Sequence, residues 1–180
     1  MGVTVKDIDN FPKIISDLKE LKNLSAFVGV SAEPDSDLAI YAGANEFGAV
    51  IKSKKAIAKL YYLMVEEGLI DEKKFPIYIW MKSKDKIVIP ERSFLRSTFH
   101  DESVMEKVKN TFTRILSSTM SPEKALSAAA DVLVSAVKSK IVSGVGPGNH
   151  PLTSAGKSGQ GTLQKSFQLH RSIRKQIVKE

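Results

Sequence analysis

The spacing of hydrophobic residues along the chain predicts several amphipathic helices. Apolar residues recur three or four positions apart, as one buried helix face requires, in five segments: 11–22, 38–47, 54–67, 102–116 and 122–142. Capping side chains are predicted at Asn10, Asp37, Ser53, Asp101 and Ser121, and helix ends at Gly48, Gly68 and Gly144. Gly48 is expected to be left-handed. At 122 the signal is strongest, because Ser121 is followed by a first-turn proline and an acid.

Short apolar runs predict the strands. Residues 24–30, "LSAFVGV", form one such run. In 75–90, two β-rich runs flank "KSKD", which predicts a hairpin that closes at Pro90. At the end of the sequence, residues 163–177 fit a final helix with a basic face, although a strand beginning within 162–169 is an open alternative. The pattern predicts an α+β fold, a small antiparallel sheet packed with several helices.

Composition divides the 180 residues into a core and an end region. Residues 1–143 are predicted to form an α+β core domain. Residues 144–161 hold six of the eleven glycines and are predicted to be a long mobile loop, followed by a basic C-terminal helix or arm over 162–180. There is no cysteine, which excludes disulfides and thiolate metal sites. No apolar run reaches the roughly 20 residues of a membrane span, so no membrane partner is expected.

The charge is unevenly distributed. Residues 1–48 carry four Lys against eight Asp and Glu, whereas residues 138–180 carry eight Lys and Arg against one Glu. Such ends can attract each other between copies of the protein, or the basic end can attract phosphate. A small basic nucleic-acid-binding module is therefore an alternative function, with its cations at Arg171, Arg174, Lys175 and Lys179 and at Lys52, Lys54 and Lys55.

Catalytic and cofactor patterns are incomplete. Gly156-Lys157-Ser158 resembles the end of a phosphate-binding loop, but Pro151 stands where that motif needs its first glycine. The three histidines are far apart in sequence and lack metal-ligand spacing. We therefore expect no enzyme activity and no catalytic, cofactor-binding or metal site.

The segment "IPERSFLRSTF" (89–99) is the most distinctive stretch of the sequence. Pro90 favours an extended Ile89, so a strand should end there. Apolar residues after it would anchor a short helical turn in the core, while Arg92 and Arg96, four positions apart, would project together from the other side. Their guanidinium groups suit carboxylates or phosphates of a partner. Alternatively, the two arginines pair within the same molecule, with Glu46 or Asp101.

Two of these motifs together resemble a known protein family. "YAGANEFGA" (41–49) and "IPERSFLRSTF" are similar to a pair of elements in small morphogenesis proteins of tailed bacteriophages and prophages, of the neck, tail-completion and tail-terminator type. Two weaker elements follow in the same order, Pro151-Leu152 and the run Gly161 to Ser166. Ser93 departs from this pattern, because a second proline is common there, and 49–88 is a long segment.

The resemblance implies a structural protein of the head–tail junction or tail end. Similar proteins assemble as rings, commonly hexameric, and contact tail-tube or head-connector proteins. They are located in the virion, and in the host cytoplasm during assembly. Candidate subunit-interface residues are Glu46, Arg92, Arg96, Arg171, Arg174 and Lys175, and the structural motif comprises Phe47, Gly48, Pro90, Phe94 and Leu95.

Overall fold

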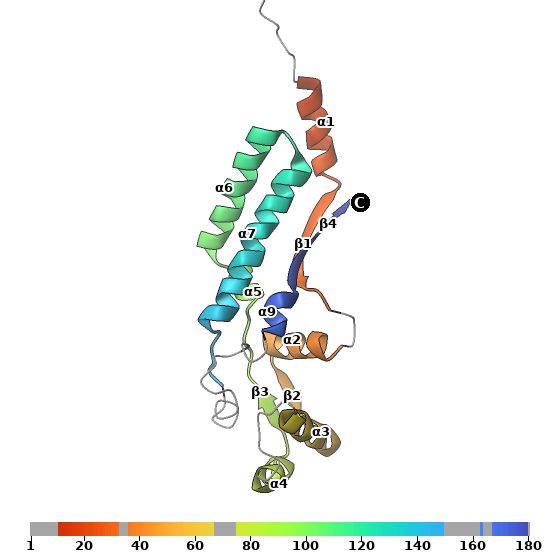
Figure 1. Ribbon diagram of the computed structural model, residues 1–180, viewed down its shortest axis with the longest axis vertical. Helices are drawn as coiled ribbons and strands as arrows, with labels where there is room; N and C mark the ends of the chain where they lie inside the picture. Colours follow the sequence, from red (N-terminus) through yellow and green to blue (C-terminus); the bar gives the residue numbers. More distant parts are fainter. Residues whose placement is uncertain (1–10, 33–35, 67–74, 150–162, 164–166, 180) are drawn as a thin grey trace, which may run out of the picture.

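The computed structural model has an α+β fold, as the sequence predicted. It describes residues 11–32, 36–66, 75–149, 163 and 167–179 (Figure 1). The helices are α1 (Phe11–Leu21), α2 (Asp37–Phe47), α3 (Lys54–Glu66), α4 (Phe75–Ser83), α5 (Arg96–Phe99), α6 (Glu102–Thr119), α7 (Pro122–Ser143) and α9 (Gln168–Ser172). The strands are β1 (Leu24–Val30), β2 (Ala49–Ile51), β3 (Ile87–Ile89) and β4 (Ile173–Lys179).

Helix α7 is the centre of the larger part of the molecule. It lies beside α6 on one side and the β1–β4 sheet on the other (Figure 1). Its buried face carries small residues, Ala125, Ala129 and Ala130, which allow neighbouring elements to approach closely. Further along α7, Val137 and Ile141 are fully buried in a core with Phe94, Leu169 and Ile173. This core joins the C-terminal end of α7 to the 89–99 segment.

The C-terminal segment forms a strand where a helix was predicted. Residues Ile173–Lys179 pair antiparallel with β1, from Val30 opposite Ile173 to Leu24 opposite Lys179. The prediction of a helix through 177 is wrong there, and only Gln168–Ser172 is helical. Ile173 and Ile177 are four residues apart, a spacing that suits both a helix face and alternate positions of a strand. Pairing with β1 decides between the two.

A second small sheet lies at the other end of the molecule. Strand β3 pairs antiparallel with β2, with Val50 opposite Val88. The predicted hairpin over 75–90 is therefore wrong, because its first run is helix α4. That helix buries Met81 against Ile57 and Tyr61 of α3. A short apolar run does not distinguish a strand from a buried helix by its periodicity.

Most helix ends follow the predicted signals. The Asp101 side chain accepts hydrogen bonds from the amides of Ser103 and Val104, and Ser121 caps α7. Helix α2 is capped by Ser36, one residue before the predicted Asp37. Gly48 has φ 72° and ψ 162°, so its φ is positive but its conformation is not the left-handed helical one expected. In the described part of the protein, no helix combines the length and apolar character needed to cross a bilayer.

Candidate interaction site at the α2–α5 junction

Glu46 is the centre of a hydrogen-bond network that joins the two sequence motifs. Its side chain is 4% exposed. Oε2 accepts hydrogen bonds from the amides of Phe94 (2.8 Å) and Leu95 (2.9 Å). Oε1 accepts from Ser93 Oγ (2.8 Å), the Arg96 amide (2.9 Å) and Arg96 Nε (3.2 Å). One carboxylate thus accepts hydrogen bonds from the backbone donors at the start of α5, which have no acceptor within that helix, across some fifty residues of sequence.

The same bonds determine the protonation of Glu46. Burial alone would raise the pKa of this carboxyl, because it disfavours the charged form. The hydrogen bonds from Leu95, Arg96, Ser93 and Phe94 together outweigh burial, and the pKa of Glu46 lies below its ordinary value. The group is therefore a stable anion in the folded protein.

Arg92 connects α2 to the segment after α7. Its side chain is 8% exposed. Nε donates to the Pro147 carbonyl (2.9 Å) and Nη2 to the Gly148 carbonyl (3.1 Å), while Nη1 donates to Asn45 Oδ1 (3.4 Å). Burial lowers the pKa of Arg92. The guanidinium thus fixes the backbone at 147–148 against the end of α2.

Arg96 points in a different direction from Arg92. Its Nη2 donates to the Glu46 carbonyl (2.7 Å) and to Glu91 Oε1 (2.8 Å), and its guanidinium carbon lies 4.7 Å from the centre of the Phe47 ring. The prediction that the two arginines project together is therefore wrong. Sequence spacing placed them on one helix face, but α5 begins only at Arg96, so Arg92 lies in irregular backbone.

The candidate interface residues have different surroundings. Glu46 and Arg92 are buried and form hydrogen bonds within the molecule. The contact between Arg96 and Glu46 agrees with the intramolecular alternative. The other acceptor considered, Asp101, caps α6 and does not pair with these arginines in the described structure. Lys175 Nζ donates to Ser127 and Asp131 of α7. Arg96, Arg171 and Arg174 are exposed. Because β4 replaces the predicted basic helix, the helical cation face of the nucleic-acid alternative is not formed.

The structural motif residues stabilise the α2–α5 junction, the contact between the end of α2 and residues 89–96. Phe94 is fully buried, and Leu95 packs against the same core. A Cβ on Gly48 would lie 3.2 Å from both the Ile89 carbonyl oxygen and the Glu91 amide nitrogen, so this position requires glycine for its φ and for the close approach. Pro90 is half-buried between β3 and the junction. Phe47 is 66% exposed, which the sequence did not indicate.

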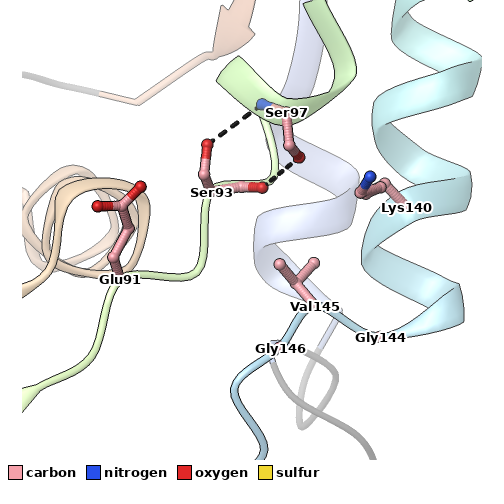
Figure 2. Close-up of a pocket in the computed structure, with 7 residues that line it drawn as sticks. All are labelled: Glu91, Ser93, Ser97, Lys140, Gly144, Val145 and Gly146. Carbon is pink, nitrogen blue, oxygen red and sulfur yellow. Dashed lines mark hydrogen bonds between the residues drawn. The ribbon is translucent and has the colours of Figure 1, made fainter. Parts of the chain in front are cut away.

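A pocket of about 360 Å³ opens beside the junction (Figure 2). It is lined by Glu91, Ser93, Ser97, Lys140, Gly144, Val145 and Gly146. Sequence reasoning did not select Lys140, Ser97 or Asn45. The only signal for Lys140 was its place in the last turn of a helix that leads into a glycine-rich segment.

Several predicted features lie outside the described residues. These are Asn10, Gly68, the loop beyond residue 149, Pro151-Leu152 and most of the run 161–166. Within the described ranges, no three His, Asp or Glu side chains are grouped as a metal site would need. Comparisons with protein-family models, curated proteins and solved structures found no match.

Proposed function

We propose that the protein is a structural subunit of a tailed bacteriophage or prophage particle, at the head–tail junction or tail end, where copies of it assemble as a ring. The observation that carries the proposal is the Glu46 network. It supports the resemblance because the two motifs, far apart in sequence, form one structural unit. Glu46 of the first motif binds the backbone of residues 94–96 in the second.

Exposed apolar side chains support a role in assembly. Phe27 on β1 is 59% exposed, and Val50 and Val88, opposite each other in the second sheet, are also exposed. Tyr62 and Trp80 add aromatic surface near that sheet. A single exposed apolar residue such as Phe27 is ordinary, but several at the β2–β3 end of the molecule are typical of a protein contact.

The sheets offer a further means of association. Each consists of two strands among the described residues, so the outer edges of β1 and β4 have no strand partner in that part of the protein. Unpaired edges can accept a strand from another molecule. A head-to-tail contact of this kind repeats until a ring closes. Tail-tube or head-connector proteins would then bind the ring.

The proposal is tested by light scattering over a concentration series, with negative-stain images of the same fractions. We expect rings, or a monomer that becomes rings at high concentration. Phe27→Lys and Val88→Lys should each weaken self-association, whereas Thr113→Lys, on the exposed face of α6, should not. A compact dimer that shifts a DNA fragment at physiological salt would contradict the proposal and favour the nucleic-acid alternative.

A further inference from the structure

The pocket beside the junction is lined by a cation, the ammonium group of Lys140, that makes no hydrogen bond or ion pair with the residues that the structure describes. Lys140 extends from the last turn of α7, and Figure 2 shows its amino group pointing toward Ser97. The residue is half-buried. An ammonium group that lines a pocket in this way can donate to an occupant that supplies an acceptor.

Two acidic residues, Asp101, whose pKa is affected by Lys140, and Glu91, which lines the pocket, make other contacts. Hydrogen bonds from the Ser103 hydroxyl and the Val104 amide lower the pKa of Asp101, and the charge of Lys140 makes a smaller contribution in the same direction. Glu91, which also lines the pocket, pairs with Arg96 at 2.8 Å. Among the described residues that line the pocket, Lys140 is therefore the cation available to a ligand.

The walls of the pocket are fixed before anything binds. On one side, Ser93 Oγ donates to Glu46 and accepts from the Ser97 amide (3.2 Å), while Ser97 Oγ donates to the Ser93 carbonyl (Figure 2). On the other side, Arg92 holds the backbone that follows Gly146 through the carbonyls of 147 and 148. A preformed pocket loses little conformational entropy on binding.

We propose that this pocket binds a carboxylate, with the Lys140 ammonium as its anchor. A single ammonium group matches the charge of a monoanion. A phosphate dianion would be poorly neutralised, because Arg92 and Arg96 already bind carbonyls and carboxylates within the molecule. The pocket is open to solvent, so an acidic side chain or the terminal carboxylate of a polypeptide can enter it. The suggestion that a neighbouring subunit or virion protein supplies this carboxylate rests on the proposed function; the binding site itself does not.

The test is a titration of the ¹⁵N-labelled full-length protein with sodium acetate, in which sodium chloride is reduced to hold the ionic strength constant. We expect saturable shifts of the Ser97, Gly144 and Gly146 amide signals with a dissociation constant in the millimolar range. Lys140→Gln should weaken binding at least about tenfold, and Lys140→Arg should restore it. Lys138→Gln, two residues earlier on α7 and outside the pocket, should bind acetate like the wild type. The amide spectrum of each variant also reports whether it is folded.

Three outcomes would overturn the proposal. They are shifts that rise linearly and spread over the surface, equal binding by Lys140→Gln, and saturation by inorganic phosphate but not by acetate. The last result would assign the pocket to a phosphate group instead. None of these outcomes bears on ring formation by light scattering, so failure of the pocket and failure of the proposed function are distinguishable.

Discussion

Glu46 and Arg96 contact each other through both side chain and backbone, although fifty positions separate them. Arg96 Nε lies 3.2 Å from Glu46 Oε1, Arg96 Nη2 donates to the Glu46 carbonyl, and the Arg96 amide donates to the Glu46 side chain. These contacts connect the end of α2 to the start of α5. They make the junction one unit whose parts can be tested separately.

Glu46→Ala should destabilise the protein by about 3–5 kcal/mol, because it leaves buried donors at 93–96 without an acceptor. Glu91→Ala is the matched control, since Glu91 is exposed and pairs with the same arginine; its loss should cost at most about 1 kcal/mol. Urea unfolding followed by circular dichroism measures both. Equal effects of the two substitutions would show that the Glu46 network contributes little.

Stability should decrease in acid because of Glu46. Its pKa is lowered on folding, so the unfolded protein binds the proton more readily than the folded one. The contribution of Glu46 is therefore complete above its ordinary pKa of about 4.5 and is lost as the pH falls through the lower folded pKa. The free energy of unfolding, measured from pH 6 to about pH 3, should show this dependence. Glu46→Gln should flatten the curve; an unchanged slope would contradict the assignment.

Phe94→Ala should cost about 3–5 kcal/mol, because a fully buried aromatic ring is replaced by a cavity. Phe47→Ala serves as a control of the same chemical change at an exposed position in contact with Arg96, and should cost about 1 kcal/mol or less. Thermal unfolding of the two variants side by side distinguishes them. A small loss of stability in Phe94→Ala would mean that the core around Val137 and Ile141 can rearrange to fill the cavity.

Arg92→Ala should destabilise the fold by about 1–3 kcal/mol, since the carbonyls of 147 and 148 and the Asn45 side chain lose their donor. Arg96→Ala should cost less because Arg96 is half exposed. If Arg92 were instead a surface residue of a subunit interface, its replacement would leave the fold intact and weaken assembly. Denaturant unfolding and light scattering on the same samples separate the two effects.

Removal of residues 173–180 should prevent folding, because β1 loses the strand with which it pairs and the core loses the fully buried Ile173. Removal of 179–180 alone should be tolerated, because Lys179 contributes only the last pair of the β1–β4 ladder, opposite Leu24, and an exposed ion pair with Glu20. Soluble yield and the amide spectrum report the outcome. A folded, soluble protein without 173–180 would support the idea of an appended arm.

The features that depend on local interactions could be predicted from the amino-acid sequence. The spans of α1, α6 and α7 follow from helical spacing, together with the capping residues Asp101 and Ser121 for α6 and α7, and β1 follows from a short apolar run. The requirement for glycine at position 48 and the burial of Phe94 could also be predicted from the sequence. In each case the information lies within a few residues of the element concerned.

The features that depend on residues distant in sequence were decided by the tertiary structure. Residues 173–179 became a strand because β1 was available to pair with them, and 75–83 became a helix because α3 offered an apolar face. The directions of Arg92 and Arg96 were fixed by the carbonyls at 147–148 and by Glu46, which lie about fifty residues away in sequence. Local spacing carries no information about such acceptors, because only the folded backbone brings them within hydrogen-bonding distance.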